Sequence, residues 1–221
     1  RLKASFDFLP VKRQGASYHS SLPQGNFASA TAIRKNPALA CGYMPDVCRE
    51  LYEHAVSGQM LHSIDDYSDL LHYALLMQED YTAFLDVNAD LSDRIRKLLP
   101  QYKSFSSFIS LLKTKQVTEA RIRRSLLHIL LGIRKKERPE DRFAGLSYAR
   151  VLGFRQSALP LFREIKKRSS IPLLTKAADA KKLLLPSELD EFLLNVRASD
   201  LYHITDPDGG YNEYRTQIIR I

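Results

Sequence analysis

The sequence predicts a mainly α-helical protein, in which a strand–loop–helix unit in residues 1–36 is followed by a helical domain in residues 37–221. The chain has 221 residues, of which 44% are hydrophobic, and this is enough to bury a sizeable core. Beyond residue 37, apolar residues recur three and four positions apart, as they do in amphipathic helices. Clear alternation of apolar and polar residues, which is typical of strands, is found in the first unit.

The first unit contains a predicted strand, a loop and a helix in that order. Residues 6–11 (FDFLPV) alternate and are rich in aromatic side chains, which predicts a short strand. Residues 14–27 hold two glycines, a proline and several serines, and they therefore predict a loop. A helix is expected to begin at Ser29 or Thr31, because both can cap a helix, and Pro37 limits its length.

The second unit is predicted to consist almost entirely of helices. Apolar spacing and cap residues predict helices at Asp46–Val56, Ile64–Met77, after Ser104, after Thr118, at Ser147–Leu152, at Ser157–Lys167 and from Pro186. The helix after Thr118 is expected to be the longest. Extended segments are predicted at Ile171–Leu174 and, more weakly, at Tyr214–Ile221.

Charge is distributed unevenly along the chain. Residues 45–93 carry 11 acidic side chains and a single basic one, whereas residues 94–168 carry 20 basic and 5 acidic side chains. A block with a net charge of +15 repels itself unless a polyanion or the acidic block neutralises it. Nucleic acid is a common polyanionic partner of a basic protein surface. Before any motif is considered, nucleic-acid binding and packing of the acidic against the basic helices both remain open.

Cysteine usage and hydropathy limit the classes of protein that this chain can belong to. Cys41 and Cys48 are too few for a disulfide scaffold, so a reducing cytoplasm is the expected location. Without paired histidines they do not predict a zinc site, and we expect buried thiols. No apolar run reaches the roughly 18 residues that a membrane span needs, so no membrane partner is expected.

An acidic cluster at Asp65, Asp66 and Asp69 has two interpretations. The three carboxylates could bind a cation, but Ser63 precedes them in the manner of a helix cap. Carboxylates in the first turn of a helix are stabilised by the helix dipole. The sequence therefore favours a solvated helix start, and it predicts no metal site.

The start of the first predicted helix has the composition of a phosphate site. Ser29 and Thr31 supply hydroxyls, Arg34 supplies a guanidinium, and the helix N-terminus supplies backbone N–H groups. Arginine suits this role because its planar fork binds two phosphate oxygens at once. From the residues alone, simple capping is favoured, since a serine or threonine before a helix usually only caps it. Phosphate binding is the alternative.

Several segments of the chain resemble a known enzyme family. Ser29–Arg34 resembles the Ser-Ser-Thr-x-Ile-Arg signature of the nucleotidyltransferase superfamily, whose first motif is His-x-x-His. More closely, the chain resembles the tRNA(Met) cytidine acetate ligase family. The matching segments are Val11–His19 (VKRQGASYH), Ala28–Lys35 (ASATAIRK), Tyr148–Phe154 (YARVLGF), Ile165–Lys167 (IKK) and Ile171–Lys176 (IPLLTK). Their order and spacing argue against a chance match.

The resemblance implies an enzyme that uses ATP to activate acetate as acetyl-adenylate. It then transfers the acetyl group to the N4 amine of the wobble cytidine in elongator tRNA(Met). ATP is the implied cofactor, with Mg²⁺ as a candidate companion ion. Residues 1–36 would be the last strand–loop–helix of an α/β nucleotidyltransferase domain, which binds ATP. The attacking group is acetate itself, so no protein nucleophile is required and no catalytic residue is assigned.

The resemblance also implies roles for a few residues. Arg13 resembles the ATP-contacting arginine of the family, and Ser29, Thr31 and Arg34 match phosphate-binding positions of the superfamily. In the basic block, tRNA becomes the favoured partner. Its phosphates are expected to meet the outer face of the helix that follows Thr118, at Arg121, Arg124 and Lys135.

One departure from the family is large. The sequence contains no His-x-x-His, so the first half of the family's ATP site is missing from it. We therefore expect that these residues correspond to part of a family member and that the chain alone is inactive. The alternative function is a non-catalytic helical module that binds RNA.

Overall fold

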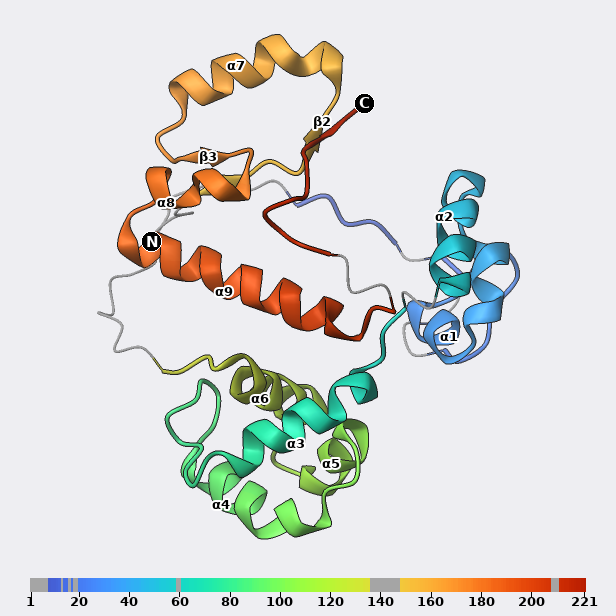
Figure 1. The fold of residues 1–221 in the computed structure, drawn as a ribbon. Helices are drawn as coiled ribbons and strands as arrows, with labels where there is room; N and C mark the ends of the chain where they lie inside the picture. The colour runs from blue at the N-terminus through green and yellow to red at the C-terminus, as the bar shows by residue number, and fades with distance from the viewer. Residues whose placement is uncertain are drawn as a thin grey trace. The chain divides into compact units, whose positions relative to one another are not determined.

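The computed structural model describes residues 8–12, 14, 15, 17, 20–58, 61–135, 148–207 and 211–221. These residues form helices joined by loops, together with a few two-residue strands (Figure 1). The mainly α fold class is thereby confirmed. The chain divides into two compact units, Arg1–Leu61 and His62–Ile221. The domain boundary predicted after residue 36 stays a prediction.

The first unit contains α1 (Ala30–Lys35), the 3-10 helix η1 (Pro37–Tyr43) and α2 (Asp46–Ser57). The side chain of Ser29 caps α1 as predicted, and α1 ends before Pro37. The predicted strand is wrong for residues 8–11, which are exposed and belong to no strand. A strand needs a partner to pair with, and these residues take part in no strand pair or β-bridge with a described residue. Residues 6 and 7 lie outside the described part of the chain.

Helix α2 confirms the prediction of a helix at Asp46–Val56, but it buries none of its residues. Val47 is 82% exposed and Leu51 is 73% exposed, so its apolar face is open to solvent within the first unit. The spacing of apolar residues therefore predicted the helix correctly, although this face has no partner among the described residues of the unit.

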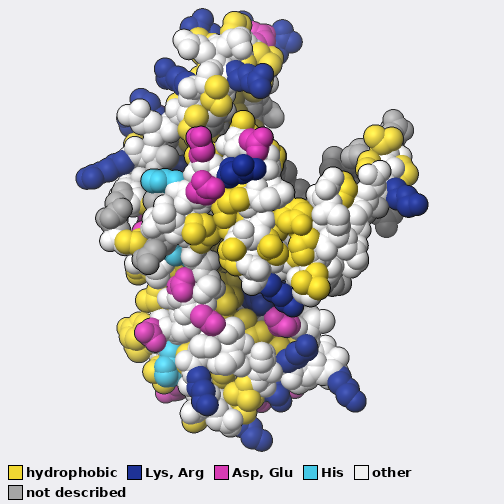
Figure 2. All heavy atoms as spheres, turned by 90° about the vertical axis from the view of Figure 1, so that its right-hand side faces the viewer, with side chains coloured by type: hydrophobic (Ala, Val, Ile, Leu, Met, Phe, Trp, Pro, Cys, Tyr) yellow, Lys and Arg dark blue, Asp and Glu magenta, His cyan; other side chains and the backbone are white. Residues whose placement is uncertain are grey.

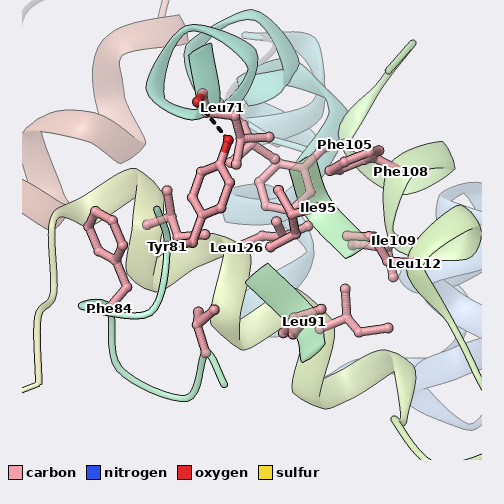
Figure 3. Packing of buried hydrophobic residues seen from close by; sticks show 14 residues of the cluster. Leu71, Tyr81, Phe84, Leu91, Ile95, Phe105, Phe108, Ile109, Leu112 and Leu126 are labelled. Carbon is pink, nitrogen blue, oxygen red and sulfur yellow. Dashed lines mark hydrogen bonds between the residues drawn. The ribbon is translucent and has the colours of Figure 1, made fainter. Parts of the chain in front are cut away.

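The second unit begins with a helical region, His62–Lys135. It contains the 3-10 helix η2 (Ile64–Tyr67), α3 (Ser68–Leu76), α4 (Ala89–Leu98), the 3-10 helix η3 (Leu99–Gln101), α5 (Phe105–Leu112) and α6 (Glu119–Leu131). These helices enclose a hydrophobic core, which Figure 3 shows from close by. Its members include Leu71, Tyr81, Phe105, Phe108, Ile122 and Leu126, all nearly inaccessible to solvent.

Local signals start and end the helices of this region. The hydroxyl of Ser104 accepts from the N–H of Ser107 at the start of α5, and that of Thr118 accepts from Arg121 at the start of α6. Gly132 ends α6 with φ = 71°, a left-handed conformation that glycine adopts without steric cost. The predicted helices after Ser104 and Thr118 are therefore confirmed.

The remainder of the second unit is a mixed region, Tyr148–Ile221. It contains β1 (Ala149–Arg150), β2 (Gly153–Phe154), the 3-10 helix η4 (Gln156–Ala158), α7 (Leu159–Arg168), β3 (Leu173–Leu174), the 3-10 helix η5 (Ala177–Asp179), α8 (Ala180–Leu183), α9 (Pro186–Tyr202), the 3-10 helix η6 (His203–Thr205) and β4 (Ile219–Arg220). Strand β1 pairs with β3 and β2 pairs with β4, both in parallel. At 17 residues, α9 is longer than α6, so the prediction that α6 is the longest helix is wrong.

The helix predicted at Ser147–Leu152 is also wrong, because Ala149 and Arg150 form strand β1. Their backbone groups bond to residues next to and within β3, with the N–H of Ala149 donating to Pro172 and that of Val151 donating to Leu174. Pairing with β3 thus satisfies these backbone groups in place of hydrogen bonds within a helix. Ser147 itself lies outside the described residues. The predicted segments at Ile171–Leu174 and in the tail do contain strands, β3 and β4.

A small core and a buried carboxylate hold the mixed region together. The core comprises Leu174, Ala177, Ala180, Leu184, Phe192 and Val196. Glu213, only 4% exposed, forms an ion pair with Arg150 and accepts hydrogen bonds from the hydroxyls of Ser199 and Tyr211. The guanidinium of Arg150 also lies over the ring of Phe192. Because all the partners of Glu213 are polar or cationic, its charge is compensated inside the protein.

Hydrogen bonds between described residues join the helical and mixed regions. The carboxylate of Asp206 lies 2.6 Å from Nε2 of His62 and 2.6 Å from Nδ1 of His203. On α6, the carbonyl of Leu131 accepts a hydrogen bond of 3.3 Å from the guanidinium of Arg197 on α9. Helix α9 accordingly lies against α6 on one side and near β3 and α8 on the other (Figure 1).

Candidate functional site

The residues predicted to bind ATP belong to the first unit, and Ser29 is the most constrained of them. Its side chain is completely buried. The hydroxyl oxygen accepts from the N–H of Ala32 at 3.0 Å, and the hydroxyl donates to the carbonyl of Ser20. The proton of Ser29 is therefore already engaged within the protein, as expected of a helix cap that also holds the preceding loop.

The loop before α1 is fixed by a close contact. Gly15 has φ = 77°, and a Cβ atom built there would lie 2.5 Å from Cβ of Phe27. Phe27 in turn exchanges two backbone hydrogen bonds with Gln24 across a tight turn at Gly25. Only glycine fits at position 15, because of both its backbone conformation and the adjacent side chain. These contacts fix Gly15 and the Gln24–Phe27 turn in the described part of the loop before α1.

Arg34 lies in the last turn of α1, and Thr31 precedes it by three residues on the same face. Arg34 is exposed, and no described side chain forms an ion pair with its guanidinium. An exposed cation of this kind is available to a phosphate, whereas the Ser29 hydroxyl is not. Arg13, the predicted ATP-contacting arginine, lies outside the described residues.

The predicted tRNA-binding residues lie on or just after α6, where Arg124 has a partner inside the protein. Its Nε donates to Oδ2 of Asp86 at 2.6 Å. This hydrogen bond lowers the pKa of the Asp86 carboxyl, and the nearby charges of Arg124, His128 and Arg121 act in the same direction. Asp86 belongs to the acidic block, so one contact between the two charge blocks occurs within the fold.

The turn that contains Asp86 is held by several further side chains of this segment. Lys135 donates from Nζ to the carbonyl of Val87 at 2.8 Å, and Ser125 donates to the carbonyl of Asp86 at 3.1 Å. Nδ1 of His128 lies 3.0 Å from the carbonyl oxygen of Leu85. Since Asp86 adopts φ = 62°, these contacts stabilise a left-handed turn at a residue other than glycine. The structure thus brings Arg124 and Lys135 together at one turn and gives both a structural role.

Arg121 differs from these two. Its side chain is exposed on α6 and forms no hydrogen bond or ion pair with any described residue, although its charge acts on Asp86. On the same helix, Arg123 pairs with Glu119 at 2.8 Å. Of the three predicted tRNA contacts, Arg121 is therefore the one whose charge is free to meet an external phosphate.

The basic surface of a second helix, α7, was not predicted from the sequence. Arg163, Lys166 and Lys167 are exposed there and have no partner among the described residues, whereas Arg168 pairs with Glu164. Figure 2 shows Lys and Arg side chains gathered at the top of the molecule, at the height of α7 in Figure 1. The run Lys166-Lys167-Arg168 in the sequence could have indicated this surface.

The acidic cluster and the cysteines do not form a metal site in the structure. Asp66 completes a capping box with Ser63, and Asp65 accepts from the N–H and hydroxyl of Ser106 at the start of α5. No group of three His, Cys, Asp or Glu side chains that could hold a metal ion occurs among the residues that the structure describes. The expectation of buried thiols is wrong, because Cys41 is only partly buried and Cys48 is exposed on α2, a helix that buries none of its residues.

Comparison with known protein families identifies the family to which the chain belongs. Residues 1–217 match the model of the HIGH Nucleotidyl Transferase family, and the chain belongs to this family. None of the described helices combines the length and the apolar character that a membrane-spanning helix requires.

The curated relatives are more specific, and they confirm the expected resemblance to the tRNA(Met) cytidine acetate ligases. The relative of that name from Caldanaerobacter subterraneus subsp. tengcongensis is 35% identical over 208 residues, which are 91% of this chain and 51% of the relative. The relative from Streptococcus mutans is 34% identical over 165 residues, which are 73% of this chain and 42% of the relative. The chain thus spans about half the length of the curated relatives it matches.

Solved structures show the same fold. TmcAL from Thermotoga maritima in its apo form I matches with a TM-score of 0.84 at 21% identity, over 96% of this chain and 55% of that one. Form II of the same protein, bound with alpha-thio ATP, matches with a TM-score of 0.78 over 90% of this chain and 53% of that one. The mainly helical architecture described above is therefore shared with this protein.

Proposed function

We propose that this chain is part of an ATP-dependent ligase that activates acetate as acetyl-adenylate and acetylates the wobble cytidine of elongator tRNA(Met) at N4. The observation that carries the proposal is the match to the HIGH nucleotidyl transferases over residues 1–217, with relatives named tRNA(Met) cytidine acetate ligase. The alpha-thio ATP bound to the Thermotoga maritima protein supports ATP as the cofactor. We also propose a cytoplasmic location, in keeping with a tRNA substrate.

Arg34 and Ser29 of the first unit have different roles in ATP binding. Arg34 binds phosphate, because its guanidinium is exposed and has no described partner. Ser29 acts indirectly, because its hydroxyl already holds the loop before α1 and the helix start. Arg13 contacts ATP as well, on the strength of its position in the resemblance, and Thr31 lies on the same face of α1 as Arg34.

Acetate-dependent exchange of pyrophosphate into ATP tests the adenylation step. The 221-residue chain alone should show no exchange, since its sequence contains no His-x-x-His. Within the intact protein, Arg34→Ala should weaken ATP binding or adenylation, because a charge-assisted contact worth about 1.5–3 kcal/mol is lost. Stability should change little. Arg13→Ala should behave similarly.

Ser29→Ala is the matched control for the ATP site. It removes a cap and should lower stability by about 1 kcal/mol, with a smaller effect on exchange than Arg34→Ala. Turnover by the chain alone comparable to that of an intact family member would overturn the expectation of inactivity. Normal exchange in both arginine variants would overturn the phosphate assignment.

For the tRNA, we propose that Arg121, Arg124 and Lys135 contact phosphates rather than bases, and that Arg124 and Lys135 do so in addition to their contacts at the Asp86 turn. Replacing all three with Gln should flatten the slope of log affinity against log salt by about two, at roughly 0.7–0.9 per lost contact. The single variant Arg121→Gln should flatten the salt slope by roughly 0.7–0.9, the value for one lost contact. It should not lower stability, because the Arg121 side chain has no described partner within the fold. An unchanged slope in the triple variant would assign these residues to internal neutralisation alone.

A second candidate function is a non-catalytic module that binds RNA. The unpaired basic side chains of α7 favour this candidate, since they would serve RNA binding with or without adenylation. The exchange assay on the intact protein separates the two functions: acetate-dependent exchange supports the ligase, whereas tRNA binding without exchange supports the module.

A further inference from the structure

A pocket of about 770 Å³ opens in the mixed region, and its described lining residues all belong to that region. Its walls come from β2, the start of α7, the segment after β3, and the chain that leads into β4. The residues that matter here are Phe154, Phe162, Lys176, Tyr214, Arg215 and Arg220. Pockets of this size hold small ligands in other proteins. The functions proposed for α1 and α6 leave it without a role.

The described charged side chains of this pocket are all positive. Lys176, Arg215 and Arg220 line it, and no carboxylate is found among the described lining residues. All three side chains are exposed, and none forms a hydrogen bond or an ion pair with a described residue. By contrast, Arg150 and Arg168 of the same region are paired with Glu213 and Glu164. Three unpaired cations around one cavity repel each other, and an anion would relieve that repulsion.

The same pocket contains aromatic surface beside its cations. The rings of Phe154 and Phe162 are nearly parallel, with centroids 5.1 Å apart, and both are half-buried. Tyr214, which is 45% exposed, adds a third ring. Thr175, Thr216 and Gln217 supply hydroxyl and amide groups that can donate and accept hydrogen bonds. Aromatic faces, hydrogen-bonding groups and cations together suit a ligand with a planar base and a phosphate.

The surface next to the pocket extends the positive charge. Helix α7 contributes Phe162 to the pocket wall and carries Arg163, Lys166 and Lys167 as exposed, unpaired cations. A free mononucleotide would use only the pocket. A polynucleotide would also place neighbouring phosphates along α7, which favours RNA over a small ligand.

We propose that this pocket binds an unpaired nucleotide of an RNA, with its base against Phe154 and Phe162 and its phosphates among Lys176, Arg215 and Arg220. The choice of RNA rests on the function proposed above, and the pocket adds base contact to a surface otherwise limited to phosphates. Unstacked bases of single-stranded RNA segments are commonly held on aromatic side chains in this way.

The experiment measures binding of the 221-residue chain to two fluorescent oligomers by anisotropy. One is a single-stranded cytidine-containing RNA of ten nucleotides, and the other has the same backbone with abasic residues. The unmodified chain should prefer the first oligomer. Phe162→Leu should weaken binding of the first about tenfold and leave binding of the second unchanged. Phe162→Tyr, which keeps a ring, should retain the preference.

Charge variants test the phosphate contacts. The triple variant Lys176→Gln, Arg215→Gln, Arg220→Gln should flatten the salt slope for the RNA oligomer by about two, at about 0.7 per contact. Lys103→Gln, Lys113→Gln, Lys115→Gln is the matched control, since these exposed lysines of the helical region also lack described partners. It should leave the slope unchanged. Thermal unfolding of each variant checks that the fold is retained.

Equal affinity of the unmodified chain for both oligomers would overturn the proposal, as would equal slopes in the pocket and control triples. Cytidine monophosphate should compete only weakly, because it lacks the phosphates that α7 would bind. Competition by the mononucleotide as strong as by the RNA oligomer would overturn RNA as the ligand. The proposal gives this pocket no role in pyrophosphate exchange, so failure of the ligase proposal and failure of this one are distinguishable.

Discussion

The two regions of the second unit are stabilised in different ways. Of the described residues, the helical region buries fourteen hydrophobic side chains in one cluster, whereas the mixed region buries six. The mixed region depends in addition on one buried carboxylate, Glu213, and on two short pairs of strands. It also holds the pocket with its unpaired cations. The comparison indicates that the two regions have different roles. The helical region has the larger core and provides stability, whereas the mixed region keeps charged side chains available for a ligand.

Phe105→Ala is the substitution expected to damage the helical region most. Phe105 is completely buried at the start of α5, and its removal should lower the free energy of unfolding by about 3–5 kcal/mol. Urea unfolding followed by far-UV circular dichroism measures the loss, which suits a chain without tryptophan. The exposed Ser110→Ala on the same helix is the control and should change the free energy by less than about 0.5 kcal/mol. A loss below 1 kcal/mol for Phe105→Ala would contradict the dominance of this core.

Glu213→Gln should break the mixed region selectively. Removing one partner of a buried ion pair costs about 3–5 kcal/mol, and the lower end applies here because the Arg150 side chain is 28% exposed. Hydrogen exchange should accelerate in α9 and β1 while α3, α5 and α6 remain protected. The double variant Arg150→Met, Glu213→Leu should recover most of the stability, since no charge is then left unpaired. Equal acceleration in both regions would mean that they unfold together, and the comparison would fail.

Tyr102→Phe should have a smaller effect, of about 1 kcal/mol at neutral pH, because the hydroxyl donates to the carbonyl of Ser68 at 2.8 Å. Burial raises the pKa of Tyr102 to about 12, so the folded state favours the neutral phenol. The resulting stability is fully present below pH 10, the ordinary pKa, and is lost as the pH rises through 12. The difference in unfolding free energy between the unmodified chain and the variant should therefore shrink over that range. A constant difference from pH 8 to 12 would contradict the raised pKa.

Arg124→Gln should have the smallest effect on stability. The Arg124 side chain is 58% exposed, and exposed ion pairs contribute about 0.2–1 kcal/mol. The loss should decline further at high salt because screening weakens the pair with Asp86. Urea titrations at low and high salt measure both values. A loss above 2 kcal/mol would show that the ion pair at Asp86 contributes much more to the stability of the helical region than its exposure indicates.

Local features of the structure followed from the sequence. Ser29, Ser104 and Thr118 were identified as cap residues because their chemistry acts within a few positions along the chain. Apolar spacing likewise located α3, α5 and α6. These signals depend on neighbours in the sequence, and for that reason they can be recognised without a structure.

Features that depend on distant residues did not follow from the sequence. Strand β1 exists through its pairing with β3, and a strand of two residues has no periodicity to detect. The partner of Arg124 is Asp86, a residue from the other charge block. For the candidate ATP site, the residue types were visible, but the engagement of the Ser29 hydroxyl with Ser20 was not. The pocket could not be predicted either, since Phe154, Thr175 and Arg215 converge only in the fold.

The parallel pairing of β2 with β4 has a consequence for the order of folding. Residue 153 must pair with residue 219, and closing the long loop between them costs entropy before any hydrogen bond is gained. The helices of the helical region form mainly from contacts close in sequence, which favours rapid formation. On a ribosome, segments that emerge earlier can also fold earlier. We therefore expect a nascent chain to complete its helical core while the pocket walls are still apart, so that the pocket becomes able to bind an RNA nucleotide only after that core has formed.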